Sequence, residues 1–256
     1  MLKGIDHVVI AVPELEEASR HYASVGFNVV PGGKHSIGTH NALIAFRDAT
    51  YIELIAFLTP ITGHPWYNAL QTGGGLVDFC MMTDDLEGDV AAMVRAGATM
   101  GAPSSMTRKR PDGYELSWEL SIPTAPWNGR VPFLIRDHTP RAERVPREHE
   151  HPNGIAGIRG VTIAVADPEA TSAIYRGVLG AAGEKMERHD LDAAGIAFMI
   201  GPHRVELVAP KSDSSPIAKW IRAHGESPFE AKLIPTLPAS EQIDPILLRR
   251  ARLGIA

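Results

Sequence analysis

A histidine and a glutamate, each inside an apolar, strand-like run, are the residues of this sequence best suited to carry chemistry. They are His7 and Glu53. Side chains alternate between the two faces of a strand, so we expect His7 to share one face of its strand with Ile5 and Val9. If the two strands are neighbours, the imidazole and the carboxylate can meet.

Glu53 should share a strand face with Tyr51 and Ile55 for the same reason. An ionised carboxylate buried there without a partner would cost roughly several kcal/mol, so it needs one. Imidazole nitrogen and carboxylate oxygen together suit divalent Fe, Mn, Zn, Co or Ni. Such an ion could hold two neighbouring oxygens of a substrate. Alternatively, His7 and Glu53 form only a charge-assisted hydrogen bond, or one of them acts as a general base without a metal.

The segments that would position these residues occur twice in the chain. Glu53 follows His7 by 46 positions, and Glu206 follows Gly160 by the same 46 positions. Chance rarely preserves sequence, order and spacing together, so the repeat determines the architecture. The matching segments are residues 4–14 with 157–167 and residues 51–56 with 204–209.

Each full copy reads as a strand, a helix and three further strands. In the first copy the helix is expected at residues 15–25, between a Pro13-Glu14 start and a stop at Gly26. Turns are expected at residues 32–33 and 47–49. The three strands after the helix are expected at residues 27–30, 40–46 and 51–57.

Weaker copies follow both strong ones. Residues 75–86 read as another first strand with a helix at 86–96, and residues 131–140 align with residues 51–60. The fourth copy begins at residues 228–234 and has room for little beyond a helix at 244–252.

A curved sheet with one helix on its back cannot cover both of its faces, so we expect modules to pair. The predicted fold is of the α+β class, with tandem βαβββ modules that form curved mixed sheets around a cleft and a truncated last module. The expected boundaries are a first half at 1–140 (modules 1–58 and 74–140), a linker at 141–153 and a second half at 154–256 (module 154–210 and partial module 226–256).

The composition is that of an ordinary globular protein, with 44% hydrophobic and 21% charged residues. The formal charge of −5 gives no reason to expect a nucleic acid or an acidic membrane as a partner. The single cysteine, Cys80, excludes an internal disulfide and favours a reducing compartment. No run reads as a membrane span or a signal peptide. We expect a cytoplasmic protein with a small-molecule partner; the exposed sheet edge of the truncated module suggests a homodimer.

Five motifs together resemble the glyoxalase-like domain family, a branch of the vicinal-oxygen-chelate superfamily. They are DHVVIAV at residues 6–12, GTHNALI at 38–44, YIELI at 51–55, PFLI at 132–135 and HPNG at 151–154. The resemblance covers most of residues 3–210. It implies the fold of a superfamily that includes glyoxalase I, extradiol dioxygenases, epimerases and bleomycin-resistance proteins, and it does not select one reaction.

The resemblance also implies a ligand set. Family members that hold a metal place its ligands on the first and last strands of paired modules, facing the cleft. Carried onto this sequence, these positions are His7 and Glu53 in the first module and Asp78 and Phe133 in the second. Phe133 cannot bind a metal, so Asp78 becomes the third ligand. His40, at the start of a neighbouring strand, is held in reserve.

The second half departs further from the family pattern. Gly160 stands where the first half has His7, while Glu206 is retained and Glu230 corresponds to Asp78. Carboxylates without a histidine make a poorer transition-metal site. We therefore expect any active cleft in the first half.

Other residues are candidates for the walls of the cleft. Thr39 and Asn41 either line it or close a turn. Trp118 and Phe133 either wall an apolar ligand site or pack in the core. The basic turn at residues 107–113 could draw in a carboxylate or phosphate, although a solvated hairpin tip is the ordinary role of such a turn.

Three functions remain open on the sequence. The first is a metal-assisted lyase, isomerase or dioxygenase that uses His7 and Glu53 on a small oxygenated organic molecule. The second is a protein of the bleomycin-resistance type that binds and sequesters a small molecule, and the third is a metal-free enzyme with Glu53 or His7 as general base. Phosphate-binding glycine loops, nucleophile elbows and paired Cys-x-x-Cys motifs do not occur, so nucleotide-binding, hydrolase and zinc-ribbon functions have no support.

Overall fold

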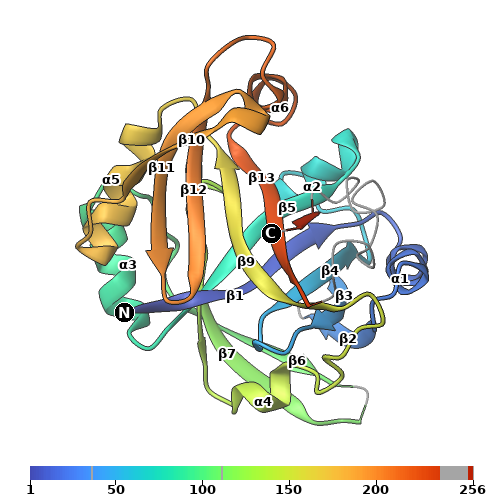
Figure 1. The fold of residues 1–256 in the computed structure, drawn as a ribbon. Helices are drawn as coiled ribbons and strands as arrows, with labels where there is room; N and C mark the ends of the chain where they lie inside the picture. Colours follow the sequence, from blue (N-terminus) through green and yellow to red (C-terminus); the bar gives the residue numbers. More distant parts are fainter. Residues whose placement is uncertain (36, 111, 237–252, 256) are drawn as a thin grey trace.

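The computed structural model describes residues 1–35, 37–110, 112–236 and 253–255, and it contains two curved sheets that lie side by side (Figure 1). The first module comprises β1 (Leu2–Ala11), α1 (Leu15–Ser24), β2 (Val30–His35), β3 (Thr39–Ala45) and β4 (Tyr51–Phe57). After α2 (Pro65–Ala69) and the 3-10 turn η1 (Leu70–Thr72), the second comprises β5 (Gly75–Thr83), α3 (Leu86–Arg95), β6 (Ser104–Lys109), β7 (Glu115–Ser121) and β8 (Phe133–Asp137).

The later modules form the second sheet. After α4 (Arg141–Arg144), the third module comprises β9 (Ile155–Ala164), α5 (Pro168–Leu179), β10 (Glu184–Arg188), the turn η2 (His189–Leu191), β11 (Ala193–Ile200) and β12 (His203–Pro210). Helix α6 (Pro216–His224), β13 (Ser227–Pro235) and β14 (Leu253–Ile255) follow. The expected order of strand, helix and three strands is thus confirmed for three modules. The helix expected at residues 244–252 lies outside the described residues.

The first two modules close into a barrel in the order β1-β4-β3-β2-β6-β7-β8-β5. One seam is the long antiparallel pairing of β1 with β5, and the other is a short pairing of β2 with β6. In the short seam, Lys34 pairs with Lys109 and His35 with Arg108. The predicted cleft is therefore the interior of a barrel. The second sheet, in the order β10-β11-β12-β9-β13-β14, stays open.

A β-bulge in β1 sets which of its side chains enter the barrel. The register of β1 against β5 shifts between Ile5 and His7. As a result, Ile5 belongs to the large core outside the barrel, whereas Val9 belongs to the cluster inside it. The prediction that Ile5 shares a face with His7 is therefore wrong, because the extra residue of a bulge reverses the alternation.

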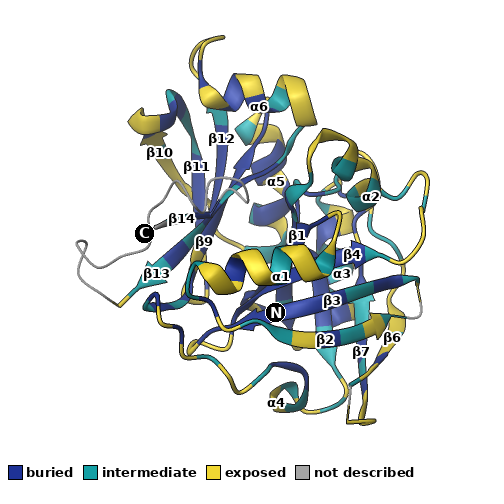
Figure 2. Ribbon diagram, turned by 90° about the vertical axis from the view of Figure 1, so that its right-hand side faces the viewer, coloured by how far each residue is buried: buried dark blue, intermediate teal, exposed yellow. Residues whose placement is uncertain are grey.

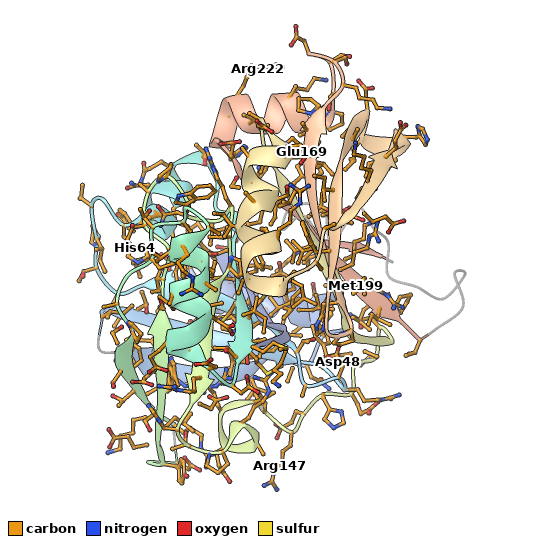
Figure 3. The ribbon with its side chains drawn as sticks, turned by 90° about the vertical axis from the view of Figure 1, so that its left-hand side faces the viewer. Asp48, His64, Arg147, Glu169, Met199 and Arg222 are labelled. Atoms are coloured by element: carbon orange, nitrogen blue, oxygen red, sulfur yellow. The ribbon has the colours of Figure 1, made fainter. Side chains whose placement is uncertain are left out.

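The large core joins the two halves. It contains side chains of β1 such as Val8 and Ile10 together with side chains of β9 such as Ile158 and Val161. Figure 2 shows that the strands are mostly buried while α1 exposes its outer face. Helices α3 and α5, one from each half, pack against each other in Figure 3. Asp48, labelled there, accepts a hydrogen bond at 3.2 Å from the backbone N–H of Ile158 across the same junction.

The second strand of the first module differs from its prediction. It spans Val30–His35, not residues 27–30, and the expected turn at Gly32 and Gly33 lies inside it. A Cβ on Gly32 would lie 2.0 Å from Oδ1 of Asn41 and 2.7 Å from Nη1 of Arg108. Gly32 therefore leaves space for two side chains of the barrel interior. In the sequence, a glycine required for this packing cannot be told from a glycine required for a turn. No helix among the described residues is long and apolar enough to cross a membrane.

Candidate functional site

The barrel encloses a cavity of about 130 Å³. One part of its wall is polar and titratable, and the rest is aromatic or aliphatic. The described residues that line it are His7, His35, Ile37, Asn41, Leu43, Tyr51, Glu53, Ile55, His64, Pro65, Trp66, Asp78, Met106, Arg108, Trp118, Leu120, Ile122, Asn128, Phe133, Ile135 and Arg144.

His7 is held in one orientation by a buried ion-pair network. Its Nδ1 lies 2.6 Å from Oδ1 of Asp6, and Asp6 accepts hydrogen bonds from Nη1 and Nη2 of Arg144 at 3.0 and 2.8 Å. Arg141 also pairs with Asp6. Burial lowers the pKa of the His7 imidazole, although Glu53 opposes the shift. Nε2 is therefore directed into the cavity as the atom that can bind a metal or a proton.

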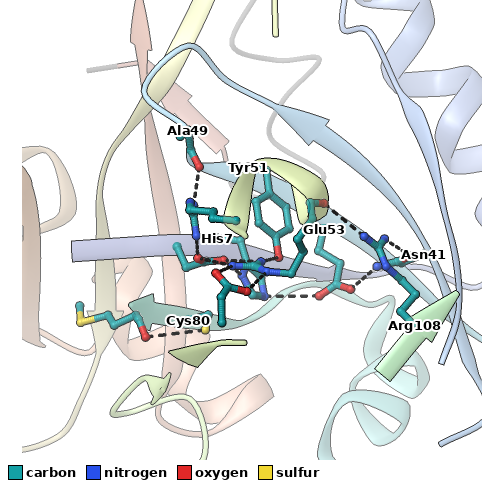
Figure 4. A network of polar contacts seen from close by, with 12 residues as sticks. His7, Asn41, Ala49, Tyr51, Glu53, Cys80 and Arg108 are labelled. Atoms are coloured by element: carbon teal, nitrogen blue, oxygen red, sulfur yellow. Dashed lines mark hydrogen bonds and ion pairs between the residues drawn. The ribbon is translucent and has the colours of Figure 1, made fainter. Parts of the chain in front are cut away.

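Glu53 lies opposite that nitrogen. Its Oε2 is 3.5 Å from Nε2 of His7, its Oε1 is 3.9 Å from Nε2 of His35, and Nδ2 of Asn41 donates a hydrogen bond of 2.6 Å to Oε1 (Figure 4). Burial alone would raise the pKa of Glu53, but the contacts with His7, His35 and Asn41 outweigh it and lower the pKa to about 2. The carboxylate is thus ionised on the cavity wall, and the predicted proximity of His7 and Glu53 is confirmed.

Asp78 is a second buried carboxyl group, with different surroundings. Its Oδ2 accepts a hydrogen bond of 2.9 Å from Nε1 of Trp66, and its Oδ1 accepts one of 2.9 Å from the backbone N–H of Phe79. Burial outweighs these bonds and raises the pKa of Asp78 to about 7. The cavity therefore holds one carboxyl group that is ionised and one that exchanges a proton near neutral pH.

The strand register agrees with the expected correspondence between modules. Val9 pairs with both Glu53 and Asp78, and Cys80 pairs with Phe133. The Phe133 ring meets the imidazole of His7 edge-on at 5.4 Å between centroids. An aromatic wall thus stands where the family pattern places a fourth ligand.

Two groups of potential metal ligands meet around His7. The ligand atoms of Asp6, His7 and Cys80 lie within 4.8 Å of one another. Asp6 is already paired with two arginines, however, and burial raises the pKa of the Cys80 thiol well above its ordinary value, so this thiol stays protonated. His7 with Glu53 fits a divalent ion better, because both present free donor atoms to the cavity.

The remaining predicted residues have the following positions. Asn41, Trp118 and Phe133 line the cavity, whereas Thr39 is buried behind it, where its Oγ1 lies 2.8 Å from Nδ1 of His35. His40 is half-buried and does not line the cavity, since it alternates with Asn41 along β3.

Several site residues carry no clear signal in the sequence. His35 follows a segment predicted as a turn, and Arg144 lies in the predicted linker. Arg108 is buried, although it belongs to the basic turn for which a solvated tip was expected, while Lys109 beside it is exposed. The sequence shows only that Arg108 lies at the strand end of that basic turn. The Arg108 side chain points into the barrel because β6 pairs with β2.

Comparison with known proteins supports the fold. A hypothetical protein from Staphylococcus aureus aligns with a TM-score of 0.68 and 15% identity over 93% of both chains. A mutant of 4-hydroxymandelate synthase from Streptomyces coelicolor aligns with a TM-score of 0.62 and 14% identity over 98% of this chain and 74% of that one. A fusion of a xylose isomerase-like TIM barrel with 4-hydroxyphenylpyruvate dioxygenase aligns with a TM-score of 0.58 and 13% identity over 98% of this chain and 38% of the fusion.

This chain therefore spans well under half the length of the fusion protein. No protein with a curated description matches the sequence significantly. Residues 5–179 match the model of the glyoxalase-like domain, which is more than half of the 256 residues. The chain therefore belongs to the glyoxalase-like domain family of the vicinal-oxygen-chelate superfamily.

Proposed function

We propose that this protein is a metal-dependent enzyme that acts on a small oxygenated organic molecule inside the barrel, with His7 and Glu53 holding a divalent ion. The observation that supports this most is the 3.5 Å approach of Nε2 of His7 to Oε2 of Glu53 on the cavity wall. Ligand atoms about 2.0–2.2 Å from one ion lie roughly 3.0–3.5 Å apart. The pair therefore has the spacing of two neighbouring ligands.

His35 is the third ligand of this proposal, and its Nε2 faces Oε1 of Glu53 at 3.9 Å while its Nδ1 is bonded to Thr39. A side chain must shift for one ion to bind all three residues, because among the described residues the donor atoms of His7, Glu53 and His35 do not all lie within 4.8 Å of one another. Each of the two histidines is thus fixed through its other ring nitrogen, as in metal sites with a supporting outer shell. Asp78, the third ligand expected from the family, has both oxygens engaged in hydrogen bonds.

Two histidines and one carboxylate with open positions are the ligand set of non-haem Fe(II) oxygenases. This set favours the dioxygenase type over the lyase and isomerase types. One of the structurally similar proteins is described as containing a dioxygenase, which agrees with that preference. The ion would act as a Lewis acid on two neighbouring substrate oxygens.

The chain's own residues would supply proton transfer and exclude water. Asp78, with a pKa of about 7, can hold or release a proton at the cavity wall. Glu53, with a pKa of about 2, is a weak base, which disfavours its assignment as the general base. Trp66 and Phe133, whose ring centroids are 5.8 Å apart, cover the wall beside Asp78 and keep water from it.

Metal analysis tests this function. Purified protein is loaded anaerobically with Fe(II), Mn(II) or Zn(II), and excess ion is removed before elemental analysis. We expect bound metal in the wild type, and an affinity lower by at least about tenfold in His7→Ala and Glu53→Gln. His189→Ala, which changes an exposed histidine of the second half, should keep the wild-type content. Equal and negligible metal in all four proteins would overturn the proposal.

Sequestration without chemistry is the second candidate, and the aromatic and aliphatic part of the cavity wall together with Phe133 at the fourth ligand position favours it. A thermal-shift screen of aromatic and dicarbonyl compounds separates the two functions. A stabilising compound that the metal-loaded protein returns unchanged supports sequestration. Turnover of that compound, lost in Glu53→Gln, supports the enzyme.

A further inference from the structure

Arg108 differs from the other buried arginines of the described chain in having no carboxylate partner. Its side chain lines the barrel cavity and the residue is 4% exposed. The ion pairs formed among the described residues include Arg144 with Asp6 and Asp137 and Arg188 with three acidic groups, but none with Arg108. Glu53 acts on Arg108 only at longer range. A buried cation without a carboxylate in direct contact is costly, so Arg108 needs a reason to lie there.

The contacts of Arg108 leave donors available. Nη1 donates to Oδ1 of Asn41 at 3.5 Å, which is a weak bond, and Nη2 donates to the backbone carbonyl of Arg144 at 3.2 Å. A guanidinium has five N–H donors in a planar fork and keeps its charge in proteins, even though burial lowers the pKa of Arg108. The fork matches a carboxylate in two parallel hydrogen bonds.

Arg108 is also connected to the proposed metal ligands. Asn41 accepts from Arg108 through Oδ1 and donates to Glu53 through Nδ2, as Figure 4 shows. Gly32 keeps the space around Asn41 and Arg108 open, since a Cβ there would collide with both. An anion on Arg108 would thus be separated by one side chain from the His7–Glu53 pair.

The cavity limits the size and charge of that anion. Its 130 Å³ is close to the roughly 150 Å³ of a dry protein cavity that admits benzene. Trp118, Leu120 and Phe133 give it flat apolar walls. The carboxyl group of Glu53 lines the same cavity, and a nearby acidic group disfavours a doubly charged anion such as a phosphate monoester.

We propose that Arg108 is a substrate-binding residue that pairs with the carboxylate of a one-ring aromatic monocarboxylate. This deepens the proposed function and rests on it only in treating the bound molecule as a substrate. The ring would occupy the apolar part of the cavity, and the carboxylate would lie on the guanidinium fork beside Asn41.

Calorimetric titration of metal-free protein with benzoate and with its neutral isostere benzamide tests the inference. We expect benzoate to bind at least about tenfold more tightly than benzamide, because only benzoate forms a charged pair. Arg108→Met should abolish the difference, and Arg108→Lys should retain part of it. Arg47→Met, which changes an exposed arginine outside the cavity, should keep the wild-type ratio.

Arg108→Met should fold, because an apolar side chain of similar volume replaces a buried charge. Its circular dichroism and melting temperature, and its unchanged affinity for benzamide, check this. Equal affinity for benzoate and benzamide in the wild type would overturn the inference, and so would an unchanged ratio in Arg108→Met. Tighter binding of phenyl phosphate than of benzoate would overturn the monocarboxylate assignment.

The same titrations distinguish this inference from the proposed function. If discrimination against benzamide appears only in metal-loaded protein and is lost in His7→Ala, the carboxylate binds at the metal. The inference about Arg108 is then wrong while the metal site stands. If the wild type binds no metal yet discriminates through Arg108, the metal-dependent function is wrong and the carboxylate site stands.

Discussion

The barrel and the second sheet contain the same acidic positions with different partners. In the barrel, Val9 pairs with Glu53 and Asp78; in the second sheet, Thr162 pairs with Glu206 and Glu230. In both regions the backbone therefore places two carboxyl groups level with each other, on the two strands that flank a central strand. Among the residues that the structure describes, the acidic pair of the barrel lines a cavity together with imidazoles, and that of the second sheet does not.

In the second sheet, arginines lie against the acidic residues, whereas the barrel has a cavity there. Nη1 of Arg188 donates to Oε2 of Glu206 at 2.9 Å, and Nη2 lies 3.2 Å from Oε2 of Glu230. Nε of Arg204 donates to Oε1 of Glu206 at 3.1 Å. Burial would raise the pKa of Glu206, but these partners and Lys232 lower it. A buried carboxylate that is already paired with arginines of the same chain, as Glu206 is, has no free oxygen for a metal or a substrate.

The largest expected effect concerns the arginine that supports each site. Arg144→Met removes one of the two arginine partners of fully buried Asp6 and the hydrogen-bonded arginine of half-buried Asp137, so it should lower the free energy of unfolding by about 3–5 kcal/mol. Arg188→Met should cost less, because Glu206 is less deeply buried than Asp6 and keeps both Arg204 and its Thr162 hydroxyl donor.

Urea denaturation at neutral pH measures the stability of Arg144→Met and Arg188→Met. Metal binding is a second measurement, because only Arg144→Met disturbs Asp6, which holds the His7 ring in place. A cost for Arg188→Met equal to or above that for Arg144→Met would show that the two regions depend equally on their arginines, and the contrast would fail.

A second effect is expected from pH. The pKa of Asp78 is raised to about 7 in the folded protein from an ordinary 3.8. Between these values the folded state binds more protons than the unfolded state, so Asp78 makes stability fall as pH rises from about 4 to 7. The loss is of order 1.4 kcal/mol per unit of pKa difference.

Asp78→Asn keeps the shape and one of the two acceptor oxygens, loses the bond to Trp66 or to Phe79, and cannot ionise. We therefore expect its stability relative to the wild type to improve from pH 4 to pH 8. Glu230→Gln, the equivalent change in the second sheet, breaks an ion pair with Arg188 and should show no gain at pH 8. Urea midpoints at the two pH values decide this. A wild type with the same pH dependence as Asp78→Asn would contradict the prediction.

The modules were predicted from a repeat with fixed spacing, and the meeting of His7 and Glu53 was predicted from the family resemblance, which places both of their strands at the cleft. Local patterns could not reveal the bulge at Asp6, because a bulge depends on the register with β5. The sequence did not predict Arg144 and Arg108 as site residues for a related reason. Arg144 lies in a polar segment and Arg108 in a basic turn, and both side chains face inward only because the barrel closes.

His35 shows the same limit. It enters the site because β2 extends through two glycines to pair with β6, where it lies opposite Arg108. Two adjacent glycines ordinarily signal a turn. Their role here is to make room for side chains from other strands, which is visible only once those strands are in place.

The smallest expected effect comes from an attempt to transfer the site. Gly160→His places a histidine at the position that corresponds to His7, but a Cβ on Gly160 would lie 2.0 Å from the backbone carbonyl oxygen of Arg204. We expect a loss of about 1–3 kcal/mol in unfolding free energy, and no metal bound, because Arg188 still occupies Glu206. Gly160→Ala should cost nearly as much, since the collision is with the Cβ itself. A folded Gly160→His protein that binds metal through Glu206 would show that a histidine alone separates the two regions, and that the arginines do not.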